Sequence, residues 1–235
     1  MNDKTAFIAS AILAISLAVW QVFAQPEGLK TLVVVQLCTI VLLSVAMLYF
    51  FLSKRGLAAK VGLIKMYDHR RSAADEEYEF MRSANRTLTL VGIMHRSLWN
   101  YSEDLEEVLL SAARRNVEIR FYLSSPDGEA LRQRAEDEGD RSDDWPQQTR
   151  LQISRFKQLK EKYPTLQLSV FTYTEYPVWH IILRDDNRAL VGWYPLGRTG
   201  YDAPLCEMSL DAPSSFCVPI ERWLRSLERN ATKVL

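Results

Sequence analysis

Two long apolar segments near the start of the chain constrain its fold more than any other feature. Residues 6–24 and 32–52 contain no Asp, Glu, Lys or Arg. At about 1.5 Å of rise per residue, a helix over either segment is long enough to cross a hydrocarbon layer of about 30 Å. The link between them, residues 25–31, contains the helix breakers Pro26 and Gly28. This pattern predicts a transmembrane hairpin over residues 1–55, with membrane lipids as the partner of residues 6–52.

The basic residues predict how this hairpin is oriented. Only Lys30 lies in the link, whereas four basic residues follow the second segment: Lys54, Arg55, Lys60 and Lys65. Because cytoplasmic flanks are enriched in Lys and Arg, both termini are expected in the cytoplasm, with the hairpin in a bacterial inner membrane. A cleaved signal peptide is the alternative for the first segment, but residues 23–25 offer no convincing cleavage site.

The remaining chain has the size of a linker followed by one domain. Residues 56–84 are expected to form a juxtamembrane linker and helix, and residues 85–235 a single cytosolic domain. The chain has 29 basic and 29 acidic residues, so no strongly basic surface for nucleic acid is indicated. The sequence contains no Walker motif, dinucleotide glycine fingerprint or metal-ligand spacing, which predicts neither a cofactor nor a metal site.

Strand and helix patterns alternate along the domain and predict an α/β fold. Strands are expected at residues 87–93, 117–123 and 166–173, and helices at residues 102–115, 149–163 and 219–228. Residues 179–183 and 189–193 flank a turn and predict a β-hairpin. The expected fold class is therefore a membrane hairpin joined to a mixed, mostly parallel sheet flanked by helices.

The order of these elements resembles one half of the phospholipase D-like superfamily. The resemblance covers residues 86–194, and the hairpin is similar to the strand pair that carries that family's H-x-K-x(4)-D motif. Aligned on Asp185, Gly192 takes the position of the family's glycine and Trp193 that of its serine. The same register places Val178 at the histidine and His180 at the lysine, so the motif is degenerate.

The resemblance implies a phosphoryl-transfer site with an altered nucleophile. In that family a histidine attacks phosphorus, which Val178 cannot do. An imidazole ordinarily titrates near neutrality, which makes His180 a candidate nucleophile or acid, and it lies on the same strand face, displaced by about 6–7 Å. Single-half members of the family dimerise, so the resemblance also implies a homodimer or higher oligomer in which two copies of His180 meet.

The candidate site residues gather around His180, which is the catalytic candidate. Candidates for ligand binding are polar or aromatic residues near His180 or at strand ends, namely His95, Arg96, Ser125, Tyr173, Trp179, Arg184, Arg198 and Glu207. Arg198 lies in a loop bracketed by glycines, where it can close on an anion. Two alternatives stay open: His180 as a strand histidine bonded to a backbone carbonyl, and Glu207 on an exposed strand face.

The sequence thus predicts a non-enzymatic or weakly enzymatic domain, a sensor or effector that recognises a phosphate-bearing ligand such as a nucleotide or a headgroup. One alternative is an active phosphodiesterase or nuclease that uses His180 at a dimer interface. A second alternative is a non-catalytic scaffold for protein contacts.

Overall fold

The chain divides into two compact units, residues 1–57 and residues 58–235. The structure is a computed structural model. It describes residues 41, 44, 58, 60–100, 102–141, 143–195, 197, 199–211 and 217–235. The second unit is built on one mixed β-sheet.

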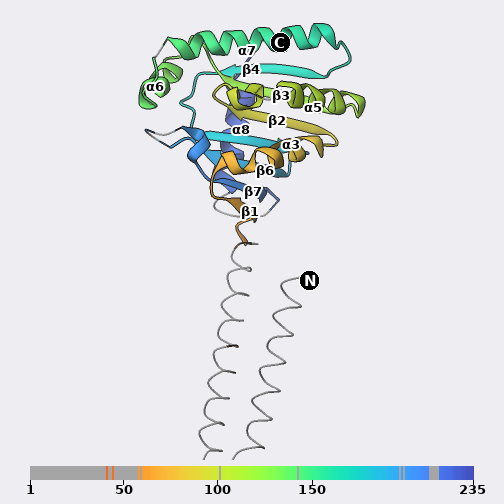
Figure 1. The fold of residues 1–235 in the computed structure, drawn as a ribbon, viewed down its shortest axis with the longest axis vertical. Coiled ribbons are helices and arrows are strands. Elements are labelled where there is room, and N and C mark those ends of the chain that lie inside the picture. Colours follow the sequence, from red (N-terminus) through yellow and green to blue (C-terminus); the bar gives the residue numbers. More distant parts are fainter. Residues whose placement is uncertain are drawn as a thin grey trace, which may run out of the picture. The chain divides into compact units, whose positions relative to one another are not determined.

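The sheet has eight strands among the described residues, in the order β1-β7-β6-β5-β2-β3-β4-β8. Figure 1 shows this stack, with β4 near α7 and β1 at the opposite edge. The strands are β1 (Leu63–Tyr67), β2 (Thr87–Gly92), β3 (Glu118–Ser124), β4 (Leu168–Tyr173), β5 (Trp179–Arg184), β6 (Arg188–Trp193), β7 (Leu205–Ser209) and β8 (Thr232–Lys233).

The sheet is mixed, as predicted, but the expectation that it is mostly parallel was wrong, because two of its seven described strand pairings are parallel and five are antiparallel. Strands β2, β3 and β4 are parallel, and helices connect them. Strands β5 and β6 form the predicted antiparallel hairpin, in which His180 lies opposite Gly192. The hairpin joins the parallel part through an antiparallel pairing of β5 with β2. His180 therefore lies on the strand next to the one that leads to His95.

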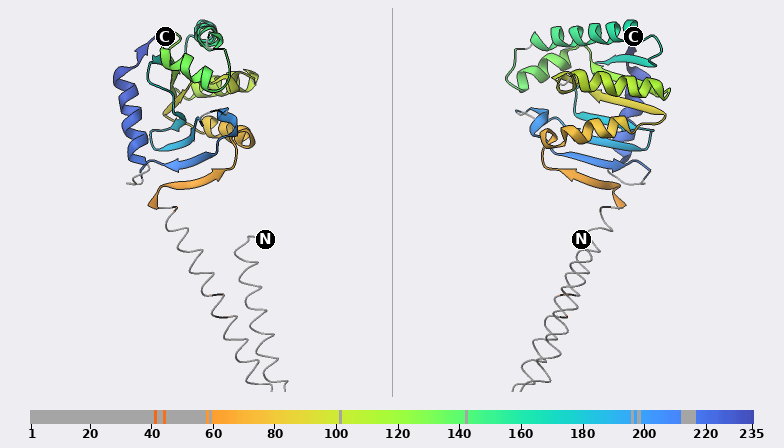
Figure 2. Two further views of the ribbon diagram at one scale, coloured as in Figure 1. Left: turned by 90° about the vertical axis from the view of Figure 1, so that its left-hand side faces the viewer. Right: turned by 45° about the vertical axis from the view of Figure 1, so that its right-hand side comes forward.

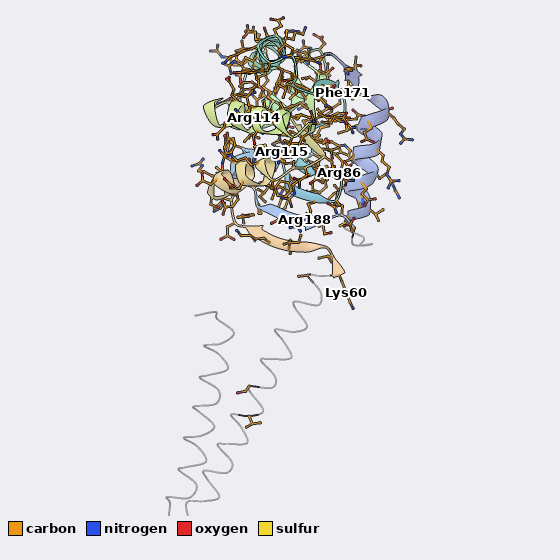
Figure 3. The ribbon with its side chains drawn as sticks, turned by 90° about the vertical axis from the view of Figure 1, so that its right-hand side faces the viewer. Lys60, Arg86, Arg114, Arg115, Phe171 and Arg188 are labelled. Carbon is orange, nitrogen blue, oxygen red and sulfur yellow. The ribbon has the colours of Figure 1, made fainter. Side chains whose placement is uncertain are left out.

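Helices cover both faces of the sheet. They are η1 (Arg70–Ala73, a 3₁₀ helix), α3 (Ala74–Arg82), α4 (Arg96–Asn100), α5 (Ser102–Arg114), α6 (Glu129–Asp137), α7 (Asp144–Lys162), η2 (Gly200–Asp202, 3₁₀) and α8 (Cys217–Asn230). Figure 2 shows α8 on one side of the sheet, with α3, α5 and α7 on the other. Three apolar clusters result among the described residues, and Phe171, labelled in Figure 3, packs against the one under α8.

Residues 63–82 form an edge strand of the sheet and a helix that packs on it. Residues 56–84 were predicted to form a juxtamembrane linker and helix. Strand β1 pairs with β7 and forms one edge of the sheet. Helix α3 follows η1 and buries Tyr78 and Met81 in the largest of the three clusters. The sequence analysis found the helix but missed β1, because its residues Lys65 and Met66 are exposed and give no apolar alternation.

The fold class expected from the sequence was wrong about the membrane hairpin. No helix in the part of the chain that the structure describes is long and apolar enough to cross a membrane. The longest of these helices, α7, has 19 residues but carries charged side chains along its length. Apart from Val41 and Ser44, the segments 6–24 and 32–52 lie outside the described residues. The described fold is an α/β domain with a mixed sheet.

The turn of the β5–β6 hairpin is fastened to the start of β2 by one carboxylate. The side chain of Asp185 accepts hydrogen bonds from the backbone N–H groups of Asn85, Arg86 and Thr87, at 2.9, 2.7 and 3.3 Å. Arg86, labelled in Figure 3, also donates to the Asp185 carbonyl at 2.9 Å. These bonds fix where the hairpin lies along β2, and so where His180 lies relative to His95.

Replacement of Asp185 by glycine tests this fastening. Glycine tolerates the φ of 53° at this position, so Asp185→Gly removes the hydrogen bonds without adding backbone strain. We expect the free energy of unfolding, measured with urea, to fall by about 1–3 kcal/mol. Asp186→Gly is the matched control, since Asp186 has a φ of 67° and its carboxylate accepts one hydrogen bond, from Thr87. Equal losses in both variants would contradict the assignment.

Candidate functional site

A buried ion pair forms the base of the candidate site. Arg70 in η1 donates two hydrogen bonds to the Glu77 carboxylate in α3, from Nε at 2.6 Å and from one terminal nitrogen at 3.2 Å. Both residues are buried, with 7% and 3% of their surface exposed. A bidentate arginine–carboxylate contact is the geometry in which a buried charge pair compensates best for its lost hydration.

Two histidines lie against this ion pair. His180 on β5 is 2% exposed, and its Nε2 lies 3.7 Å from a Glu77 carboxylate oxygen. His95, just beyond the end of β2, is 4% exposed, and its ring centroid lies 5.6 Å from that of His180. None of the four ring nitrogens makes a hydrogen bond within the described part of the chain. The site therefore holds four polar side chains in the order Arg70, Glu77, His180, His95.

Gly92 makes the close packing of this cluster possible. A Cβ atom at this position would lie 2.8 Å from the Tyr194 hydroxyl, 3.1 Å from His95 Cε1 and 3.4 Å from His180 Nδ1. The Tyr194 hydroxyl also accepts a hydrogen bond of 3.3 Å from the backbone N–H of Ile93. A glycine at the end of β2 thus lets two histidines and a tyrosine meet at one point.

Burial and charge set the protonation of the cluster. Although burial opposes its ionisation, the Arg70 guanidinium lowers the pKa of Glu77 to about 2. Burial and then the charge of Arg70 lower the pKa of His180 to about 4, against the opposing effect of Glu77. Burial, His180 and Arg70 hold the pKa of His95 well below its usual range. At neutral pH the cluster contains one compensated ion pair and two uncharged imidazoles.

A cavity of about 300 Å³ opens beside His95, beyond the carboxyl end of β2. Arg70 and Arg96 bring positive charge to its wall, and Glu138 and Asp140 bring negative charge. The aromatic rings of Trp145, Tyr194 and Tyr201 line it as well, together with Thr199 and Gly200. Ligands of open α/β sheets commonly bind beyond the carboxyl ends of the strands, and this volume is at the lower limit of about 300–1,000 Å³ for small-molecule sites.

The structure brings three of the predicted site residues together. His95 and Arg96 line the cavity, and Arg96 is exposed at the start of α4. His180 contacts His95 from behind but does not line the cavity. The alternative of a backbone carbonyl partner for His180 is not observed among the described residues. Arg198 lies outside the described residues.

The other predicted residues lie elsewhere. Arg184 is at the opposite end of β5, where it contacts Ser83 and the ring of Phe80. Four further predicted residues make contacts outside the cavity wall: Tyr173, Trp179, Ser125 and Glu207. Tyr173 donates to the Gly92 carbonyl at 3.1 Å and Trp179 packs on the α8 side of the sheet, while Ser125 forms a turn after β3 and Glu207 pairs with Arg188.

The sequence analysis missed Arg70, Glu77 and Tyr194. Arg70 and Glu77 are seven residues apart in a charged stretch that reads as a solvated linker. Their burial follows from the packing of α3 against the sheet, which no local pattern reveals. Tyr194 directly follows the predicted hairpin, and this position, two residues after Gly192, was the one signal available in the sequence.

The comparisons with known proteins give only distant structural likenesses. No protein-family model matches the chain, and no curated protein matches it either. The archaeal chromatin protein TrmBL2 superposes with a TM-score of 0.45 at 12% identity, covering 86% of this chain and 70% of that one.

Two further solved structures are members of the phospholipase D-like superfamily. Phosphatidylserine synthase from Haemophilus influenzae has a TM-score of 0.45 at 10% identity, covering 67% of this chain and 36% of that one. NucT from Helicobacter pylori has a TM-score of 0.41 at 11% identity, covering 72% of this chain and 96% of that one. At these identities the side chains of the site, and not the likenesses, have to carry any functional conclusion.

Removal of one partner of the buried ion pair tests its role. Glu77→Gln leaves the Arg70 guanidinium without its carboxylate, and we expect the free energy of unfolding to fall by about 3–5 kcal/mol. The control is Glu79→Gln on an exposed part of the same helix, with an expected change within about 0.5 kcal/mol. The double variant Arg70→Met/Glu77→Leu should lose less than Glu77→Gln, because no charge is left uncompensated. If the double variant loses as much free energy of unfolding in urea as Glu77→Gln, or more, the coupling of the two charges is disproved.

Proposed function

We propose that the domain of residues 58–235 binds a phosphate-bearing ligand in the cavity beside His95. The observation that carries this proposal is the combination, in one open cavity, of two arginines with aromatic rings and hydroxyl groups. The planar guanidinium group matches the oxygens of phosphate with two parallel hydrogen bonds. The cavity therefore has the donors that a phosphate group requires.

Arg96 is the arginine with capacity to bind the ligand. Arg70 already donates two hydrogen bonds to Glu77. Arg96 makes no ion pair among the residues that the structure describes, and its side chain is exposed at the cavity. A phosphate in the cavity would gain a direct contact with Arg96, whereas the charge of Arg70 is compensated by Glu77.

The rest of the wall favours a nucleotide over a glycerophosphate headgroup. Tyr194 and Tyr201 line the cavity with aromatic rings, and a nucleobase that stacks on such a ring gains about 1–3 kcal/mol. Asp140 accepts a hydrogen bond of 2.8 Å from the Trp145 indole and has further acceptor capacity for an exocyclic amino group. A glycerophosphate has no ring for such stacking.

Titration of the full chain with nucleotides tests the proposal. At least one of the four nucleoside monophosphates should raise the melting temperature, and the matching nucleoside and glycerol phosphate should do so much less. Arg96→Ala should weaken binding, measured by calorimetry, by about tenfold or more, because a charged hydrogen bond is lost. Arg114→Ala is the control: Arg114, labelled in Figure 3, is exposed on α5 and does not line the cavity.

Three results separate the ligand classes. A response to glycerol phosphate that equals the response to nucleotides would identify a headgroup-type ligand. Equal effects of Arg96→Ala and Arg114→Ala would place the ligand elsewhere. If no phosphate compound shifts the melting temperature, the proposal fails and a scaffold for protein contacts becomes the better explanation.

A phosphodiesterase is the second candidate function, because His95 lines the cavity and His180 lies behind it. Direct attack by His180 is blocked by its burial, since it is 2% exposed. We therefore expect no turnover of bis(p-nitrophenyl) phosphate by the full chain. Hydrolysis that His95→Gln or His180→Gln abolishes, with the circular dichroism spectrum unchanged, would establish the enzyme instead.

The homodimer or higher oligomer implied by the family resemblance stays a prediction.

A further inference from the structure

His95 combines a left-handed backbone conformation with a buried side chain at the cavity wall. Its φ of 51° is in the left-handed region, which is unfavourable for a residue other than glycine. The side chain is 4% exposed, and neither ring nitrogen has a hydrogen-bond partner among the described residues. A buried polar group without a hydrogen-bond partner destabilises the folded protein. Such strain at the wall of a cavity points to a role in binding.

Among the described residues no carboxylate contacts the His95 ring, and the Leu90 carbonyl is a nearby group that favours a proton on it. The edge of its ring meets Phe121 of β3, with centroids 5.6 Å apart, and His180 of β5 lies against it. Glu77 of α3 lies beyond His180, and its charge is compensated by Arg70 of η1. The remaining titratable groups at the cavity come from the neighbouring segments: Arg96, Glu138, Asp140, Tyr194 and Tyr201.

The acidic groups at the cavity wall are already engaged. Glu138 accepts hydrogen bonds of 3.1 and 2.6 Å from Arg134, and Asp140 accepts one from Trp145. The charges of Arg70 and Glu77 cancel, so a proton on His95 would be an uncompensated charge in a buried place. An anion in the cavity would supply the missing compensation. The free protein and the complex should therefore differ in the protonation of His95.

We propose that His95 takes up one proton from solvent when an anionic ligand enters the cavity, and that it binds the ligand as an imidazolium ion. This inference rests on the proposed function, since it concerns the same cavity. The proton adds to a ring nitrogen of His95, and the positive charge of the ring then attracts the anionic ligand across the cavity wall. Glu77, held ionised by Arg70, favours the added charge from behind His180.

The linkage has a defined sign. Without ligand the pKa of His95 is well below its usual value because of burial and the charges near it, and a bound anion raises it. Between the lower and the higher pKa, binding consumes a proton, so affinity falls as pH rises, by up to about tenfold per pH unit. An uncharged ligand of the same shape raises the pKa much less and shows no such dependence.

Calorimetry of the full chain tests the inference. The probes are the methyl phosphodiesters of the four nucleoside 5′-monophosphates, whose phosphate keeps a single negative charge throughout the neutral range. The binding enthalpy is measured in buffers that differ in ionisation enthalpy, and the slope gives the number of protons taken up. We expect a value approaching one near pH 6 for the natural chain, and a value near zero for His95→Gln.

The three histidines of the chain provide the controls. His69→Gln, an exposed site outside the cavity wall, should leave the proton uptake unchanged. Proton uptake that survives in His95→Gln but is lost in His180→Gln would overturn the assignment to His95. Binding of a probe without proton uptake would overturn the inference and leave the proposed function standing, whereas absence of binding by all four probes would count against the proposed function itself.

A direct measurement covers the case in which His95→Gln does not fold. The ring nitrogen and carbon signals of the three histidines in the natural chain are followed by NMR during titration with the probe that binds. The His95 signals should move to imidazolium values, while the His69 signals should not respond. His95 signals that stay at neutral-imidazole values in the saturated complex would refute the inference.

Discussion

The buried contact between Arg70 and Glu77 is the interaction on which the arrangement of the site depends. It joins η1 to α3 by two hydrogen bonds and places a fixed carboxylate 3.7 Å from His180 Nε2. Because each charge compensates the other, the pair can remain buried among apolar side chains. It also sets the electrostatics of the histidines, since Arg70 disfavours and Glu77 favours a proton on either ring.

A second constraint fixes the distance between the two histidines. His180 belongs to the hairpin and His95 follows β2, so their contact requires the hairpin to keep one register against β2. Asp185 secures that register by accepting hydrogen bonds from the backbone at the start of β2. Gly92 then leaves the space in which the rings and Tyr194 approach each other. The position of His95 at the cavity wall depends on the Arg70–Glu77 ion pair, on the Asp185 hydrogen bonds and on the space at Gly92.

Much of the domain could be predicted from local sequence patterns, and the site could be predicted only in part. Apolar alternation and helical periodicity located the central strands, α5, α7 and α8. The site candidates at the end of β2, His95 and Arg96, proved to line the cavity. Arg184 shares a strand face with His180 but lies at the far end of β5, where it contacts Ser83 and Phe80. The transmembrane hairpin was inferred from hydropathy alone, and the described helices do not include one.

The sequence by itself determined the alternation of strands and helices, the hairpin and the strand-end position of His95, because these follow from contacts between residues close in the chain. Only the tertiary structure decided that Arg70 and Glu77 are buried, that Tyr194 reaches Gly92 and that His95 meets His180. The physical reason is that burial and charge compensation depend on which elements pack together. Residues 70, 77, 95, 180 and 194 meet through the packing of α3, β2 and β5, and no local spacing in the sequence records that packing.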